Sequence, residues 1–158
     1  MRKTLIIAID PDADKSGVAM LNRVTRELDG RTMTFTEILE MVAVTPKDAK
    51  VLIEAGYLNQ SNWHITHTTS ARKAAAMGQA VGRNHETARK LVDVCRFYSL
   101  DVEEVRPLRK IWRGRDGKIT HDEITQFMQL PNRTNQEVRD AALIAWNYAG
   151  LPMKLKLK

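Results

Sequence analysis

The amino-acid sequence predicts an α/β fold with a mixed five-stranded sheet flanked by helices. Five short apolar or β-branched runs have the length of strands, and helical patterns separate the last two from the runs before them. The first three runs follow one another with only turns between them, which favours antiparallel pairing. Because 158 residues are enough to bury one core, we expect a single domain over 1–158, with a flexible basic tail at 152–158.

The three N-terminal strands are expected at 4–10, 17–21 and 31–35. The run TLIIAID is typical of a strand buried on both faces, and it ends at Asp10. The segment PDADKSG then turns the chain, and ELDG supplies the hairpin signal before the third strand. Thr36 is expected to cap a short helix, which Thr45 and Pro46 end.

The second half of the chain adds two strands and further helices. The run KVLIEAGYL predicts a fourth strand that is apolar until Glu54, and DVEEV at 101–105 predicts a fifth. Between them a long helical pattern covers 70–100 and carries many small residues. Thr120 and Glu123 form a capping box, which predicts the start of another helix.

The last helical stretch, 132–150, carries acids beside its apolar face. At 100° per residue, that face collects Val138, Ala141, Ile144, Ala145 and Tyr148. Glu137 and Asp140 lie at its edge, where a charge without a compensating partner is costly to bury. A capping box from Thr134 gives Glu137 an alternative structural role, whereas Asp140 lies beyond the cap. Gly150 is expected to end the helix.

Four carboxylates, those of Asp10, Glu54, Glu137 and Asp140, are expected to meet in one site. In open α/β sheets, functional groups gather outside the carboxyl ends of the strands, where Asp10 and Glu54 are expected. Oxygen donors of this kind suit Mg²⁺, and two such ions about 4 Å apart can promote phosphodiester hydrolysis. Taken singly, Asp10 could simply begin a turn, and Glu54 could be a solvated strand end.

The charge distribution favours a polyanionic partner. The chain has 25 Lys and Arg against 19 Asp and Glu, a net charge of +6. One basic segment, interleaved with Trp112, contains Arg106, Arg109, Lys110, Arg113, Arg115 and Lys118. It is either a solvated surface or a mobile arm that grips phosphates, and the second reading implies strongly salt-dependent binding. Arg72 and Lys73 on the long helix could extend this surface.

The remaining composition indicates a cytoplasmic protein with no membrane partner. The single Cys95 cannot form an internal disulfide, and the N-terminal apolar run is too short for a secretion signal. No stretch has the length of a bilayer span. His64 and His67 are spaced like zinc ligands, but no cysteine pair accompanies them, so we expect no zinc site there.

The chain resembles the RuvC-type Holliday-junction resolvases, or crossover junction endodeoxyribonucleases, whose fold is ribonuclease H-like. The likeness lies in five segments in the same order: IAIDPDADKSGVAML, LIEAGYL, AAAMGQAVGRNHE, VRPLRKIWRGRDGKITHDEI and EVRDAALIAW. Ribonucleases H proper usually take their second acid from the first helix, where only Glu37 and Glu40 could serve, whereas resolvases take it from the fourth strand, as at Glu54. The resemblance implies an endonuclease of bacterial or viral origin that resolves DNA four-way junctions by paired, symmetric, metal-dependent cuts.

The resemblance also assigns roles to individual residues. It implies that the four acids, Asp10, Glu54, Glu137 and Asp140, hold two Mg²⁺ ions, for which Mn²⁺ could substitute. It places Lys118 near the scissile phosphate and gives Tyr57 the role of stacking on bases at the crossover. Two departures are visible: Asp12 and Asp14 stand in a turn where the family usually has a glycine, and Glu137 stands where Asp or His is commoner.

The long helix carries a flat surface of small residues that includes Met77, Gly78, Val81 and Gly82. Glycines inside a helix reduce its stability, so a close packing partner is expected there, either the protein's own sheet or a second copy. The resemblance implies a homodimer, which would present two active sites to a junction of approximate two-fold symmetry. The rival functions are a relaxed branched-DNA or flap nuclease of the same fold and a non-catalytic junction-binding protein. The sequence identifies no branch-migration partner.

Overall fold

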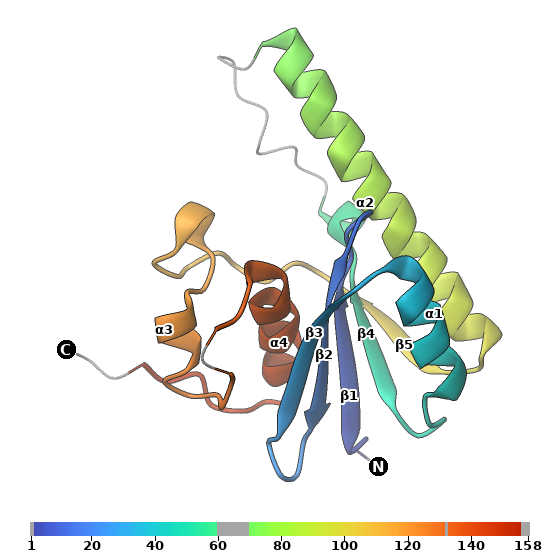
Figure 1. Cartoon of the computed structure of the whole chain (residues 1–158), viewed down its shortest axis with the longest axis vertical. Helices are drawn as coiled ribbons and strands as arrows, with labels where there is room; N and C mark the ends of the chain where they lie inside the picture. The colour runs from blue at the N-terminus through green and yellow to red at the C-terminus, as the bar shows by residue number, and fades with distance from the viewer. Residues whose placement is uncertain (1, 60–69, 132, 156–158) are drawn as a thin grey trace.

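The computed structural model describes residues 2–59, 70–131 and 133–155 and has the expected α/β architecture (Figure 1). Its strands are β1 (Leu5–Asp10), β2 (Ser16–Asn22), β3 (Leu28–Met33), β4 (Lys50–Glu54) and β5 (Asp101–Val105). Its α-helices are α1 (Phe35–Val44), α2 (Ala71–Phe97), α3 (His121–Ile124) and α4 (Gln136–Tyr148). The histidines His64 and His67 fall outside the described residues.

The sheet is mixed, as the sequence predicts. Its strand order is β3-β2-β1-β4-β5. The pairs β1–β2 and β2–β3 are antiparallel, whereas β4 is parallel to both β1 and β5. Helices α1 and α2 lie on one face of the sheet, and α3 and α4 lie on the other (Figure 1). The parallel strands β1 and β4 therefore end side by side at the same edge.

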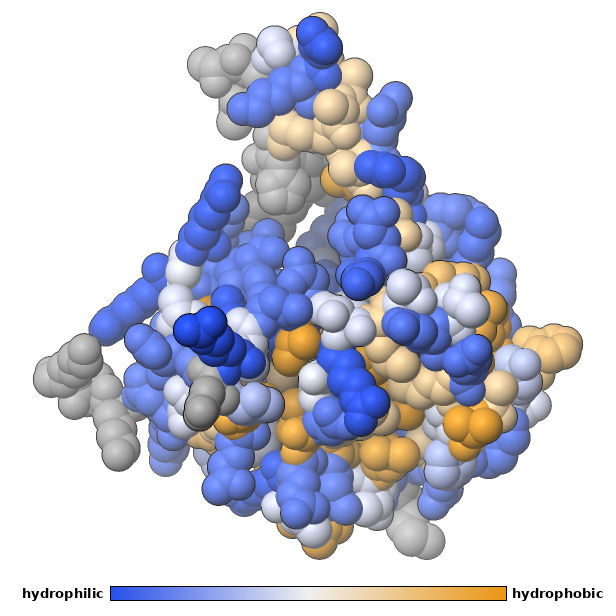
Figure 2. Space-filling view, in the orientation of Figure 1, coloured by the Kyte–Doolittle hydropathy of each residue, from blue (hydrophilic) through white to orange (hydrophobic). Residues whose placement is uncertain are grey.

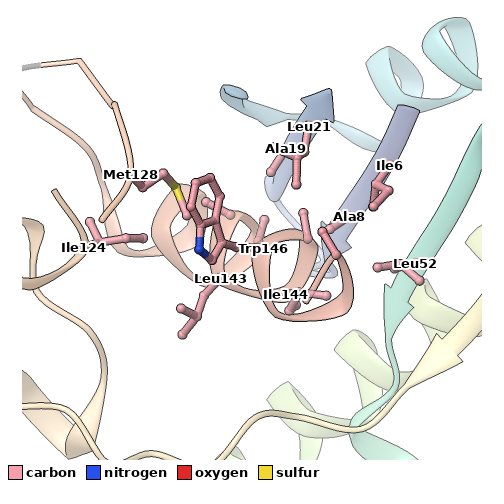
Figure 3. Close-up of a cluster of buried hydrophobic side chains, with 14 of the residues drawn as sticks. Ile6, Ala8, Ala19, Leu21, Leu52, Ile124, Met128, Leu143, Ile144 and Trp146 are labelled. Carbon is pink, nitrogen blue, oxygen red and sulfur yellow. The ribbon is translucent and has the colours of Figure 1, made fainter. Parts of the chain in front are cut away.

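Strand alternation divides the buried side chains into two cores. Ile6, Ala8 and Leu52 point toward α4 and pack with the side chains of α3 and α4 (Figure 3). Ile7 and Ile9 point the other way and pack against α1 and α2. Since successive strand residues face opposite sides, even-numbered residues at the ends of β1 and β4 point toward α4. The acids that end these two strands both have even numbers.

Helix α4 approaches the sheet closely because glycine lies beneath its first turn. A Cβ atom built at Gly17 of β2 would lie 2.0 Å from the carbonyl oxygen of Glu137, and one at Gly30 of β3 would lie 2.5 Å from a methyl group of Val138. Gly17 is paired with Asp10 in the sheet. The two glycines thus set the distance between the start of α4 and the end of β1.

We expect Gly17→Ala to destabilise the fold by roughly 1–3 kcal/mol or more, since the clash is with backbone and an overpacked interior relieves strain only by shifting. Gly30→Ala should cost less, because the Val138 side chain that it meets can change rotamer. Urea unfolding of both variants measures the difference. Equal stability of Gly17→Ala and the wild type would show that α4 does not press on β2.

Several local predictions are wrong by one or two residues, because neighbouring polar residues compete to cap a helix. Thr34, not Thr36, caps α1 and forms a capping box with Glu37. Asn135, not Thr134, caps α4, where its side chain accepts a hydrogen bond from the Val138 amide. Glu137 therefore has no part in a capping box.

Other features of the helices agree with the sequence or differ only in extent. The Thr120–Glu123 capping box is confirmed, but α3 is a single turn. Tyr148, expected on the apolar face of α4, is 37% exposed. Gly150 directly follows Ala149, the C-cap residue of α4, and has a φ of 70°, so the helix ends where the sequence predicts. No helix in the described ranges is long and apolar enough to cross a membrane.

Candidate active site

A cavity of about 120 Å³ lies between the carboxyl ends of β1 and β4, the middle of α4 and the basic loop. We define the basic loop as residues 106–118. Asp10, Glu54 and Asp140 line this cavity together with Lys118. The positions of the three acids predicted that they would share a site with Glu137, and the family resemblance placed Lys118 there. The structure brings the three acids and Lys118 into one cavity, although they are up to 130 positions apart in the chain (140 − 10).

The regular geometry of the sheet explains how the three acids come together. Ile9 of β1 is paired with Ile53 of β4, so Asp10 and Glu54 follow at adjacent positions on neighbouring parallel strands. Both residues have even numbers, and the even-numbered residues at these strand ends point toward α4. Asp140 lies on the second turn of α4, next to the buried Ala141. The sequence pattern at the start of α4 thus directs one further carboxylate at the two strand ends.

The acids repel one another in a poorly solvated place. Burial raises the pKa of Asp10 well above its usual value, and repulsion from Glu54 and Asp140 raises it further. Burial and the charge of Asp140 raise the pKa of Glu54 to about 7, although Lys110 and Lys118 act in the opposite direction. The cavity therefore carries negative charge that the fold only partly compensates.

Asp140 is held in place by two partners on opposite oxygens. Gln136 donates a hydrogen bond of 2.8 Å to Oδ1, and Lys118 Nζ lies 3.4 Å from Oδ2. Gln136 is one helical turn before Asp140, which is the spacing at which helix side chains meet. Gln136 was not among the predicted site residues, although its i, i+4 relation to Asp140 is visible in the sequence.

Arg139 ties the segment after Lys118 to α4. Its Nε donates to the Ile119 carbonyl oxygen at 3.1 Å, and the Gln136 amide donates to the same oxygen at 3.2 Å. The Ile119 side chain is itself buried in the core. Since Ile119 is fixed from both sides, the neighbouring Lys118 has a defined position beside Asp140. Sequence reasoning also missed this role, because nothing local shows that the Arg139 side chain reaches residue 119.

Glu137 lies at the edge of the site. Its side chain is exposed and does not line the cavity, although its charge contributes to the raised pKa of Asp10. Its backbone packs against Gly17, which faces Asp10 across the β1–β2 pair. Its expected role as a metal ligand stays a prediction.

The basic loop is held by its own hydrogen bonds. The Trp112 amide donates to Gly117 O and the Gly114 amide to Lys118 O, both at 2.9 Å. The Arg113 amide donates to the buried Glu123 carboxylate at 3.1 Å. Of the predicted DNA-binding residues, Arg109, Lys110 and Lys118 line the cavity, whereas Arg106, Arg113 and Arg115 are exposed outside it.

Tyr57 is packed on the α2 side of the sheet, in the short turn after β4. The Arg89 guanidinium lies 4.3 Å from its ring centroid, and the His85 ring meets it edge-on at 5.7 Å. Its hydroxyl group donates to the Glu104 carboxylate, and burial together with this bond raises its pKa to about 12. The expected stacking of Tyr57 on a base stays a prediction.

The N-terminal part of α2 projects beyond the sheet (Figure 1). Pale orange small residues run along this projection among blue polar ones (Figure 2). Cβ atoms built at Gly78 and Gly82 meet nothing within 4 Å in the described part of the chain, so packing on the protein's own sheet does not account for these glycines. Met77 is half-buried and Val81 is 36% exposed. Arg72 and Lys73 are exposed in the first turn of the same projection.

The donor set fits a hard divalent cation with an incomplete protein shell. All three cavity acids offer oxygen atoms, and a cation would relieve the repulsion that raises the pKa values of Asp10 and Glu54. Among the described residues, no three His, Cys, Asp or Glu side chains are placed so that they could hold one ion between them. Mg²⁺ is usually held by one or two carboxylates, completed by water and substrate phosphate, so this arrangement suits it better than a closed protein cage would.

The sheet order, the strand directions and the helices on both faces define the ribonuclease H-like fold. Among solved structures, the chain is similar to T. thermophilus RuvC in complex with a Holliday junction substrate, with a TM-score of 0.53, 14% sequence identity and 92% of each chain covered. At this identity the likeness shows the fold. No protein-family model matches the sequence, and no curated protein matches it significantly.

We expect the metal-free protein to lose stability as the pH rises. The folded-state pKa of Glu54 is about 7 against 4.5 for the free group, so its contribution is fully present below about pH 4.5 and is lost as the pH passes 7. The loss from this residue is on the order of 3 kcal/mol. Asp10 acts in the same direction. Thermal unfolding with a chelator should show a falling midpoint between pH 5 and pH 8.

The matched variants for this measurement are Glu54→Gln and Glu40→Gln. Glu54→Gln removes the titrating group and should flatten the pH dependence, whereas Glu40 is an exposed residue of α1 and its replacement should leave the slope unchanged. A slope that is the same in all three proteins would contradict the raised pKa of Glu54.

Proposed function

We propose that this protein is a divalent-metal-dependent endodeoxyribonuclease that resolves DNA four-way junctions by paired, symmetric cuts. The observation that carries the proposal is the convergence of Asp10, Glu54 and Asp140 in one cavity, beneath a loop rich in arginine and lysine. Carboxylates that repel one another beside exposed cations are a poor arrangement for binding phosphate alone. They are a suitable one for binding phosphate through a metal ion.

In this proposal the acidic residues bind the metal ions and the basic residues bind the DNA. Asp10, Glu54 and Asp140 would supply carboxylate oxygens to two Mg²⁺ or Mn²⁺ ions, with one or two of these acids on each ion and Glu137 at the rim. When bound, the metal supplies Lewis-acid stabilisation and a more acidic water for attack on the phosphodiester. Lys118, fixed beside Asp140, places a positive charge next to the reacting phosphate. The arginines of the basic loop bind the flanking phosphates.

A homodimer would match the symmetry of the substrate. Within the described residues, nothing lies within 4 Å of a Cβ at Gly78 or Gly82, so another helix could approach closely there, with Met77 and Val81 beside them. An isologous contact through this surface would place two cavities in a symmetric pair. Sedimentation of the wild type and of Gly78→Trp, which blocks close approach, separates a dimer held by this surface from a monomer or a dimer held elsewhere.

A cleavage panel tests the proposed activity. Equal concentrations of four-way junction, fork, flap and linear duplex are incubated with Mg²⁺, with Mn²⁺ and with a chelator. We expect paired nicks in the junction only, and none with the chelator. Comparable cutting of forks and flaps would instead indicate a relaxed branched-DNA nuclease of the same fold.

The second candidate is a non-catalytic junction-binding protein. The contact between Lys118 and Asp140 favours it, because a lysine already compensates one of the carboxylates. Junction binding that is indifferent to divalent ions, with no cleavage in either Mg²⁺ or Mn²⁺, would support this candidate against the nuclease.

A further inference from the structure

Ile111 differs from the other exposed apolar side chains of the described chain in its surroundings. It is 71% exposed, and Val24, Val44 and Phe97, which lie elsewhere in the chain, have similar exposures of 76%, 82% and 81%. Single exposed apolar residues are ordinary and need no explanation. Ile111, however, lies between Lys110 and Trp112, which both line the cavity of the acids, whereas it does not line that cavity itself.

The loop that carries Ile111 is anchored directly after it. Trp112 packs on the core, with its ring centroid 6.2 Å from that of Phe127, and its amide donates to Gly117 O at 2.9 Å. The next amide, that of Arg113, is held by the buried carboxylate of Glu123. Gly117 has a φ of 74°, and a Cβ there would lie 2.6 Å from Lys110 O. These contacts fix the backbone that follows Ile111 and so limit where its side chain can lie.

The neighbours of Ile111 carry positive charge on both sides. Arg109, Lys110 and Arg113 are all exposed, and the first two reach the cavity rim. These cations attract a phosphate backbone, while the branched apolar side chain between them has no water-excluding partner in the described part of the chain. Apolar side chains flanked by cations are the type that insert between base steps and unstack them, and isoleucine is among the residues used for this purpose.

We propose that Ile111 is an apolar wedge that inserts between bases next to the branch point of the DNA bound in the cavity. The inference rests on the proposed function, and it names how that site recognises a branch rather than continuous duplex. Bases at a branch point are less well stacked than in duplex, so the cost of opening them is lower there. A rigid wedge would therefore favour branched DNA over linear duplex.

The test uses four-way junctions that carry 2-aminopurine at single positions flanking the branch point, because the fluorescence of this base rises when it is unstacked. Protein in the Asp10→Asn background keeps the DNA uncut. We expect a fluorescence rise with Ile111 and with Ile111→Leu, and its loss with Ile111→Ser, which should also bind roughly tenfold more weakly because less apolar surface is buried. The salt dependence of binding should not change, since no phosphate contact is lost.

Val24→Ser is the matched control, since it replaces an equally exposed β-branched residue in the turn between β2 and β3. It should leave both fluorescence and affinity unchanged. The wedge is refuted if Ile111→Ser keeps the full fluorescence rise and wild-type affinity, or if the wild type binds the junction without any rise. If the wild type does not bind the junction at all, the proposed function fails as well, so the two failures are distinguishable.

Discussion

Asp10→Asn is expected to reduce junction cleavage by at least about 100-fold while raising the stability of the metal-free protein. The first effect follows from the loss of a charged oxygen donor, since even the outer partners of metal ligands cost about 10–100-fold when they are removed. The second follows from burial and repulsion, which raise the pKa of Asp10 and so oppose its ionised form in the folded state. A neutral amide of nearly the same shape avoids both penalties.

The opposite signs of these two effects make the experiment decisive. A residue that only supports the fold would lose activity and stability together when it is replaced. Cleavage rates are measured in Mg²⁺ and thermal midpoints at pH 8 with a chelator. Asp93→Asn, at an exposed position of α2, is the control and should change neither quantity. Near wild-type cleavage by Asp10→Asn would remove the basis of the proposed nuclease.

The strand ends of the site were predictable because the signals are local. The apolar runs of β1 and β4 each stop at an acid, and the parity of Asp10 and Glu54 then fixes the side of the sheet that they face. Asp140 was predictable from its place beside the apolar face of α4. The role of Glu137 was harder to predict, because an exposed acidic side chain at the start of a helix can have several functions.

The contacts that position the site were not predictable, since they join segments that no sequence pattern relates. Arg139 reaches the Ile119 carbonyl twenty positions away. The contacts of Tyr57 with Arg89 of α2 and Glu104 of β5 also have no signature in the sequence. The predicted caps of α1 and α4 were wrong for a different reason, because several Thr and Asn residues near the start of each helix can serve as the cap.

Glu123 makes one contact that the sequence predicts and one that it does not. Its capping box with Thr120 is readable from the T-x-x-E spacing and is confirmed. Its second duty, accepting the Arg113 amide at 3.1 Å, joins α3 to the basic loop across ten positions and has no sequence signature. The carboxylate is 5% exposed and also accepts from the Thr120 hydroxyl group at 2.9 Å.

Glu123→Ala is therefore expected to release the basic loop as well as to destabilise α3. It removes the acceptor of three partly buried donors, the Arg113 amide and the Thr120 amide and hydroxyl group. An unpaired buried donor costs about 1–3 kcal/mol, but water can reach these groups in part, so we expect a total loss of roughly 2–4 kcal/mol. Because the loop carries Lys110 and Lys118 to the cavity, cleavage should fall at least about tenfold at temperatures where the variant is still folded.

The measurement pairs urea unfolding with limited proteolysis by trypsin, which cuts after lysine and arginine and so reports exposure of the basic loop. Faster cutting within residues 106–118 in Glu123→Ala, but not in Asp122→Ala at the exposed neighbouring position, would show that this carboxylate holds the loop. Glu123→Gln keeps one acceptor oxygen and should lie between the wild type and the alanine variant in both assays. Identical cutting patterns in all four proteins would mean that the loop keeps its shape without Glu123, and that Trp112 packing and the turn at Gly117 suffice to present Lys118 to Asp140.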